Sequence, residues 1–132
     1  MIGIDTNVLV RYATQDDPDQ SALADDAISG FTESNPGFVG AITLAESVWV
    51  LRRVYRVDSQ AVATFVSFLL DAREIVLEHP AAVRRSLAAT SGDERFTDCL
   101  IAEIGADAGC EHTLTFDRRA AHLPHVRLLG TG

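Results

Sequence analysis

Four acidic side chains stand where the sequence pattern places the end of a strand or the beginning of a helix. Asp5 and Asp117 each directly follow a short apolar run, whereas Glu46 and Asp98 lie near the predicted starts of two helices. Carboxylates that gather at one point repel each other unless a cation neutralises them. Oxygen ligands without a pattern of His or Cys are those that Mg²⁺ or Mn²⁺ prefers. These four acids are therefore candidate ligands of a divalent metal ion.

The chemistry of such a site is metal-assisted hydrolysis of a phosphodiester. Magnesium keeps several waters and joins one or two carboxylates to a substrate phosphate. The metal activates water and stabilises the attacking and leaving oxygens. The formal net charge of −8 argues against a surface that attracts nucleic acid as a whole, but a bound cation would recruit phosphate locally. All eleven basic residues are Arg, so any mechanism that needs a lysine is excluded.

Each acid also has a simpler explanation. Thr43 and Glu46 match a capping box, and Asp98 suits the dipole at a helix start. Asp117 suits an ordinary turn. Asp5 is harder to explain in this way, because burying a carboxylate beside a sheet is costly. We favour the hypothesis that the four acids meet at one site. Separate explanations for each acid do not account for an acid at every available strand end or helix start.

The elements that must position these acids alternate between strands and helices. The chain has 132 residues, 47% of them hydrophobic, which is enough for one domain with a core that needs no disulfide. The predicted strands lie at residues 2–4, 38–40, 75–77, 113–116 and 126–129, and the predicted helices begin at Thr6, Pro18, Thr43, Ser59, Pro80 and Phe96. This alternation predicts a three-layer α/β/α sandwich with a mostly parallel central sheet. Strand ends and the helix starts that follow share one edge of such a sheet, so the four acids can meet there.

The two cysteines and the apolar segments favour a soluble protein. Cys99 and Cys110 lack the paired spacing of a zinc or redox motif, and we expect each to be a small buried side chain. No apolar run approaches the roughly 18 residues of a membrane span. Asp5 interrupts the first apolar run, unlike a signal peptide. We expect a cytoplasmic protein without a membrane segment.

Four short motifs carry a resemblance to a known family. They are Asp5-Thr6-Asn7 after the first strand, Thr43-Leu44-Ala45-Glu46, Phe96-Thr97-Asp98-Cys99-Leu100-Ile101-Ala102, and Thr115-Phe116-Asp117-Arg118 at the end of the fourth strand. In this order and spacing the chain resembles the PIN-domain ribonucleases, and most closely the VapC-type toxins of bacterial toxin–antitoxin pairs. The resemblance runs over nearly the whole chain.

The resemblance implies a single PIN-like domain over residues 1–132 and a specific function. By the resemblance, Asp5, Glu46, Asp98 and Asp117 would be the catalytic residues that hold Mg²⁺ or Mn²⁺. Asn7 and Thr115 would orient carboxylates or water. The protein would be a metal-dependent endoribonuclease toxin, with an RNA substrate, a cognate antitoxin and a homodimeric state. We expect Thr6 to be a plain helix cap, and Asp93 to be a loop or cap residue rather than a ligand.

Other residues leave alternatives open. Arg95, Arg118 and Arg119 are candidates for contact with RNA phosphates, although a solvated surface explains them equally well. The apolar stripe formed by Trp49, Phe65, Phe68 and Leu69 suits either a groove for a partner helix or, more simply, the core. The four histidines have no metal-ligand spacing.

Two other functions compete with the nuclease. A non-catalytic PIN-like module that binds RNA or a partner has no need for clustered carboxylates. A phosphatase of the haloacid-dehalogenase type also begins with a strand and an Asp, but that family uses Asp-x-Asp and a lysine. Here Asn7 occupies the second position and lysine is absent, which excludes the phosphatase.

Overall fold

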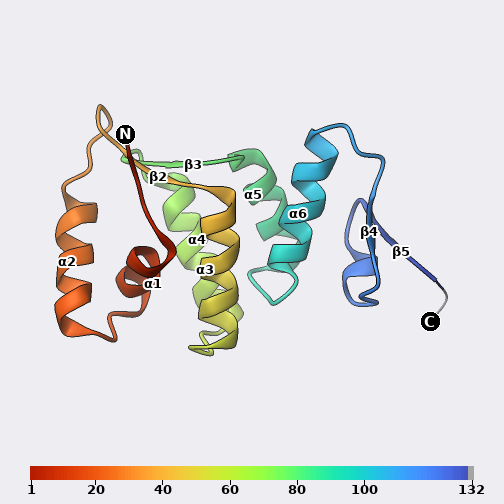
Figure 1. The fold of residues 1–132 in the computed structure, drawn as a ribbon, viewed down its shortest axis with the longest axis horizontal. Helices are drawn as coiled ribbons and strands as arrows, with labels where there is room; N and C mark the ends of the chain where they lie inside the picture. The colour runs from red at the N-terminus through yellow and green to blue at the C-terminus, as the bar shows by residue number, and fades with distance from the viewer. Residues whose placement is uncertain (131–132) are drawn as a thin grey trace.

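Helices and parallel strands alternate along the chain in the computed structural model, which describes residues 1–130 (Figure 1). The strands are β1 (Ile2–Gly3), β2 (Gly37–Val39), β3 (Ile75–Leu77), β4 (Thr113–Thr115) and β5 (Val126–Leu128). The helices are α1 (Thr6–Thr14), α2 (Pro18–Ser29), α3 (Ala41–Arg53), α4 (Ser59–Asp71), α5 (Pro80–Thr90) and α6 (Phe96–Asp107), with a short 3₁₀ helix η1 (Ala120–His122) before β5. The predicted α/β sandwich class is confirmed. Within the described residues, no helix is long and apolar enough to cross a membrane.

Local sequence signals explain several helix ends. Pro18 occupies the first turn of α2, where its missing N–H is not needed, and the Asp17 carboxylate accepts a hydrogen bond from Gln20 N. Gly30 is the C-cap residue of that helix. Asp58 caps α4 in the same way, by accepting from Ala61 N at 2.8 Å. At these helix starts, the capping side chain bonds to a backbone N–H only three residues away in the sequence.

The main core lies between the β1–β3 sheet and the helices that pack on it. Val39 of β2 is fully buried, and so are Val62, Val66 and Leu69 of α4, which share one helix face. Helix α6 adds Phe96 to this cluster. A second, smaller cluster consists of Cys99, Ala120 and Leu123, with Val126 packed against it. Helix α6 therefore contacts two separate cores.

The five strands form two sheets rather than one central sheet, which differs from the prediction. β1, β2 and β3 form a parallel sheet in that order, and β4 and β5 form a separate parallel pair. The β4–β5 pair lies on the other side of α6 from the β1–β3 sheet (Figure 1). The smaller cluster holds it there, together with the buried Glu103 carboxylate of α6, which lies 3.6 Å from His125 Nε2. Helix α6 thus separates strands that the prediction placed in one sheet.

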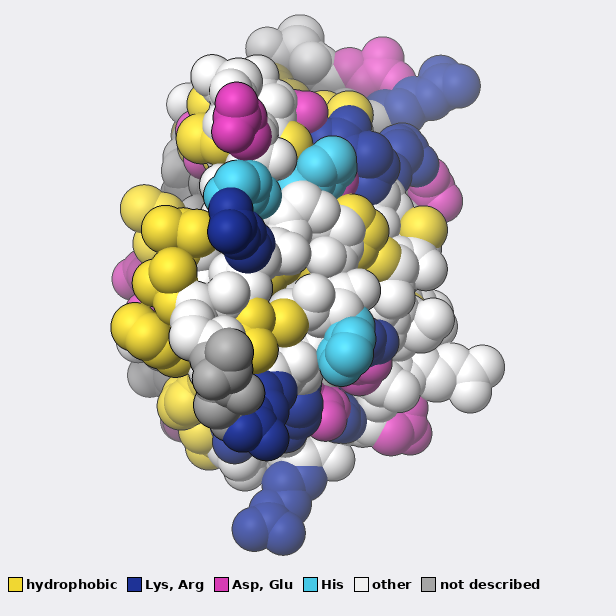
Figure 2. Space-filling view, turned by 90° about the vertical axis from the view of Figure 1, so that its right-hand side faces the viewer, with side chains coloured by type: hydrophobic (Ala, Val, Ile, Leu, Met, Phe, Trp, Pro, Cys, Tyr) yellow, Lys and Arg dark blue, Asp and Glu magenta, His cyan; other side chains and the backbone are white. Residues whose placement is uncertain are grey.

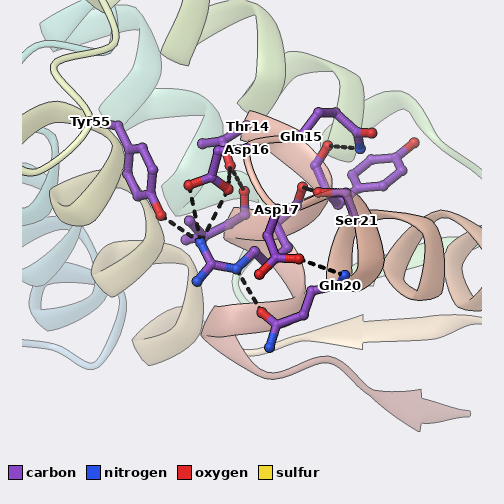
Figure 3. A network of polar contacts seen from close by, with 10 residues as sticks. Thr14, Gln15, Asp16, Asp17, Gln20, Ser21 and Tyr55 are labelled. Atoms are coloured by element: carbon purple, nitrogen blue, oxygen red, sulfur yellow. Dashed lines mark hydrogen bonds and ion pairs between the residues drawn. The ribbon is translucent and has the colours of Figure 1, made fainter.

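A polar network joins the ends of α1, α2 and α3 (Figure 3). Arg11 of α1 is its centre. The guanidinium donates to the Tyr55 hydroxyl at 2.6 Å, to Gln20 Oε1 at 2.7 Å and to Asp16 Oδ1 at 3.1 Å. Ser21 Oγ donates to the Arg11 carbonyl. The network fixes the turn between α1 and α2, and so helps to orient the helix that begins beside Asp5.

Asp16→Asn is expected to lower the melting temperature slightly at neutral pH. A hydrogen bond from the Thr14 hydroxyl, together with the Tyr55 hydroxyl and the Arg11 charge, lowers the pKa of Asp16 from 3.8 despite some desolvation. Because the folded pKa is lowered, the carboxylate stabilises the fold above its unfolded pKa, and this stabilisation is lost as the pH falls through the folded value. The difference between wild type and variant should therefore disappear in acid. Thermal unfolding from pH 7 downwards measures it, with the exposed Asp26→Asn as control; a pH-independent difference would contradict the argument.

Candidate functional site

Asp5 joins the end of β1 to the start of α1. It occupies the N-cap position of the helix, but its side chain makes no capping hydrogen bond and is exposed. The next residue, Thr6, is nearly buried, and its hydroxyl donates to Glu46 Oε1 at 2.5 Å. Thr6 was predicted to be a helix cap, and this prediction is wrong: Thr6 lies inside the helix and holds a carboxylate of α3. The bond links the Asp5 motif to Glu46 across 40 residues of sequence.

Glu46 lies one turn further into its helix than predicted. Helix α3 begins at Ala41 with Gly40 as its N-cap, so Thr43 lies within the first turn and Glu46 in the second. The capping box is therefore wrong, because Thr43 does not occupy the cap position. The Glu46 side chain is exposed apart from its bond to Thr6. It is available as a ligand on the same edge as Asp5.

Asp98 and Asp117 lie close to each other, although 19 residues separate them in the sequence. Asp98 is in the first turn of α6, as predicted, and is half-buried. Burial raises the pKa of Asp98, the nearby negative charge of Asp117 raises it further, and Arg119 partly offsets both. The negative charge of Asp117 therefore opposes the ionisation of Asp98, which is the situation that a cation relieves.

A turn at the end of β4 holds Asp117. Its backbone N–H donates to the Thr115 hydroxyl at 3.0 Å, and its Oδ1 accepts from Arg119 N at 2.8 Å. Asp117 is thus a turn residue, and its charge is close enough to Asp98 to raise the pKa of Asp98. Thr115 orients Asp117 through the main chain rather than through the carboxylate.

The acids come together as two neighbouring groups. Asp5 and Glu46 are linked through Thr6, and Asp98 lies near Asp117. The groups are connected where the Thr97 hydroxyl of α6 donates to the Ala45 carbonyl of α3 at 3.2 Å. Among residues 1–130, however, no three acidic, His or Cys side chains are close enough to hold one metal ion. The oxygen donors fit Mg²⁺ or Mn²⁺, because such an ion needs only one or two carboxylates and completes its coordination with water and substrate phosphate.

The comparison with known families identifies the family of the chain. The family model of the PIN domain matches residues 2–126, which include all four candidate acids. The chain belongs to the PIN domain family. No curated protein matches the sequence. PIN domains are typically metal-dependent nucleases that act on RNA, so the match supports nuclease activity in general and the use of Mg²⁺ or Mn²⁺.

The three candidates for contact with RNA phosphates in this PIN domain, Arg95, Arg118 and Arg119, have different surroundings. Arg95 pairs with Asp93, with Nη2 2.9 Å from Oδ2, and although burial alone would raise the pKa of Asp93, the hydrogen bonds from Arg95 lower it overall. Asp93 is thus a loop residue held by Arg95, as predicted. Arg118 is exposed, and Arg119 lies 3.9 Å from Asp117.

The structure also adds two basic residues to the candidates for contact with RNA phosphates. Arg52 and Arg53, in the last turn of α3, line a shallow depression together with Glu94 and Arg119. We call Arg52, Arg53 and Arg119 the basic patch. Three cations drawn from two distant segments were not recognisable from spacing, although the Arg pair at the end of a helix was a partial signal. The basic patch lies near Asp117, because Nε of Arg119, one of its members, is 3.9 Å from Asp117 Oδ1.

Three further expectations have mixed outcomes. Asn7 lines an open groove between α1 and α2. Cys99 is buried as predicted, whereas Cys110 is exposed, and that prediction is wrong because the turn after α6 leaves it at the surface. The apolar stripe is not one continuous surface, because Leu69 is fully buried while Trp49 is 52% exposed.

Proposed function

We propose that this PIN domain is a Mg²⁺- or Mn²⁺-dependent endoribonuclease that acts as the toxin of a toxin–antitoxin pair. The observation that carries the proposal is the approach of Asp98 and Asp117 from separate segments. Burial and mutual repulsion raise the pKa of Asp98 there. Two carboxylates held close together repel each other unless a cation binds between them. Such a pair therefore supports a cation site.

The four acids would hold the metal, each positioned by a different element. Asp98 and Asp117 would contribute from the start of α6 and the end of β4. Asp5 and Glu46 would contribute from the other group, where the Thr6 hydroxyl holds one oxygen of Glu46 and leaves the second available. Asn7 and Thr115 would orient the ligands or water. When bound, the metal would polarise the phosphodiester and lower the pKa of a bound water.

The basic patch would contact the phosphates of RNA beside the acids. Arg52 also pairs with Glu94 at 3.0 Å, so part of its charge is already balanced, whereas Arg53 is exposed. Arg95 and Arg118 would contribute further out. Binding through so few cations on an acidic protein should depend strongly on salt concentration.

A cognate antitoxin would inhibit the enzyme by covering the acids. An antitoxin arginine inserted among them would form charge-assisted hydrogen bonds with the carboxylates, which are stronger than neutral ones. The toxin would act as a homodimer in the cytoplasm. These partners follow from the family resemblance and from the concentration of acidic charge at one edge.

A second candidate function is a PIN module that binds RNA or a partner without cutting it. The separation of the acids into two groups within residues 1–130 favours this alternative, because an incomplete ligand set would bind metal weakly. Calorimetry with Mn²⁺ separates the two functions. Absence of Mn²⁺ binding would favour the binding module.

Cleavage of RNA by the purified protein tests the proposed enzyme. We expect cleavage with added Mn²⁺ or Mg²⁺ and none after chelation. Asp117→Asn should reduce the rate on the order of 100-fold or more, because the loss of a residue that only supports a metal ligand already costs about 10- to 100-fold. Asp71→Asn, at the far end of α4, is the matched control and should cleave normally. Equal cleavage by wild type and Asp117→Asn would indicate a contaminating nuclease and contradict the proposal.

A further inference from the structure

The outer edge of β1 is open for pairing. The backbone N–H groups of Ile2 and Ile4 donate to β2, at Pro36 O and Phe38 O, both at 2.9 Å. Because peptide groups alternate in direction along a strand, the N–H and C=O of Gly3 point away from β2. In the described part of the chain, no strand pairs with this side. Ile2 beside it is 52% exposed.

The outer edge of β4 is open in the same way. Thr113 N donates to His125 O at 2.6 Å, and Leu129 N donates to Thr115 O at 2.7 Å, so these two residues of β4 face β5. Leu114 and Phe116 therefore direct their peptide groups outward. Their side chains are 54% and 82% exposed. Figure 2 faces this side of the molecule and shows hydrophobic side chains gathered along one flank.

The two edges are complementary. If Gly3 lies opposite Thr115 in a parallel pair, the N–H of Gly3 reaches the carbonyl of Leu114, and the N–H of Phe116 reaches the carbonyl of Gly3. Two open edges with apolar side chains are templates for pairing with each other. In this register Asp5 lies opposite Asp117, because each acid follows the paired residue by two positions.

We propose that β4 of one copy of this chain pairs with β1 of a second copy, and that the partner's Asp117 thereby completes the acid site around Asp5. Pairing within one chain would require the β4–β5 pair to leave the small cluster of Cys99, Ala120 and Leu123, against which Val126 of β5 packs. Pairing with a second copy keeps that cluster. A two-fold dimer would make both pairings at once, so each sheet would gain β4 and β5 from its partner. The proposal rests on the proposed function only for the role of the acids.

Disulfide cross-linking tests the pairing without any measurement of activity. Ile2 and Leu114 each precede their acid by three residues, so this register places them opposite each other. Neighbouring strands bring Cα atoms within reach of a disulfide. Ile2→Cys and Leu114→Cys chains of different mass, both carrying Cys110→Ser, are mixed and oxidised. We expect a mixed disulfide dimer, and much less of it when Ile42→Cys replaces Ile2→Cys. If no mixed dimer forms, or if both cysteines on one chain cross-link only within that chain, the proposal is overturned.

Complementation between inactive variants tests the shared site. Asp5→Asn and Asp117→Asn are each expected to be inactive, but a mixed dimer contains one site with both native acids. Random exchange of equal amounts should restore about one quarter of wild-type cleavage, because half of the dimers are mixed and each has one intact site of two. No recovery, with the cross-link absent, would place both acids of a site on one chain and overturn the proposal. If wild type does not cleave RNA but the cross-link forms, the proposed function fails and the pairing stands.

Discussion

Asp98→Asn is expected to abolish RNA cleavage and yet to raise the melting temperature of the metal-free protein. Burial and the charge of Asp117 raise the pKa of Asp98, so the ionised side chain is unfavourable in the folded protein. Asn keeps the size of the side chain and removes the charge. The position in the first turn of α6 favours a negative charge through the helix dipole, but the raised pKa shows that burial and repulsion outweigh this effect.

The two effects of Asp98→Asn are measured separately. Cleavage should fall on the order of 100-fold or more, as for any lost metal ligand. Thermal unfolding with a chelator should show the variant melting slightly above wild type, and added Mn²⁺ should stabilise wild type more than the variant. Asp107→Asn, at the other end of the same helix, serves as control and should cleave normally, because its partner is Arg85 at 2.7 Å. If Asp98→Asn destabilised the metal-free protein, the carboxylate would be structural rather than a ligand.

Phe96→Ala is expected to have the largest effect on stability. Phe96 is the first residue of α6, is fully buried and belongs to the main core. Truncating a buried Phe to Ala costs about 3–5 kcal/mol, through lost burial and the cavity left behind. A domain of this size is stable by only about 5–15 kcal/mol, so much of the free energy of unfolding would be lost. Because Phe96 anchors the turn that carries Asp98, cleavage should fall together with stability.

Chemical denaturation measures the Phe96→Ala effect, and Phe116→Ala provides the matched control. Phe116 is 82% exposed in the single chain, so the same substitution there should change the free energy of unfolding by less than about 0.5 kcal/mol at a concentration where the protein is monomeric. An equal loss in both variants would mean that Phe116 is buried in solution, and would contradict the exposure seen here. A negligible loss in Phe96→Ala would contradict its place in the core.

Local chemistry explains which parts of the fold were predictable. Pro18, Gly30 and Asp58 mark helix ends through contacts with residues close in sequence, and the predicted helix starts at Pro18 and Ser59 are confirmed. The assignment of Thr6 failed because its partner, Glu46, lies 40 residues away, and a capping pattern cannot reveal such a contact. Glu46 was misplaced by one turn because the N-cap of α3 is Gly40, which has no side chain to signal the start of a helix.

The pairing of strands was the least predictable part of the fold and of the site. The strands have only two or three residues, so their alternating patterns are too short to specify neighbours. The charge of Asp117 influences Asp98, whereas the predicted convergence of all four acids stays a prediction. The sequence did not predict that the β4–β5 pair would form a separate sheet beyond α6, because this depends on how the chain turns after α6.

The unequal size of the two cores determines where the molecule opens first. The β4–β5 pair rests on a cluster of three buried residues, whereas the remaining strands and helices share the large core. Backbone amides of β4 and β5 should therefore exchange with solvent through sub-global openings that leave α3 and α4 intact. Asp117 would leave the site in each such opening. The rate of RNA cleavage should then fall at a lower temperature than the circular dichroism signal of the helices. The reason is that β4 and β5 open before the rest of the fold is lost.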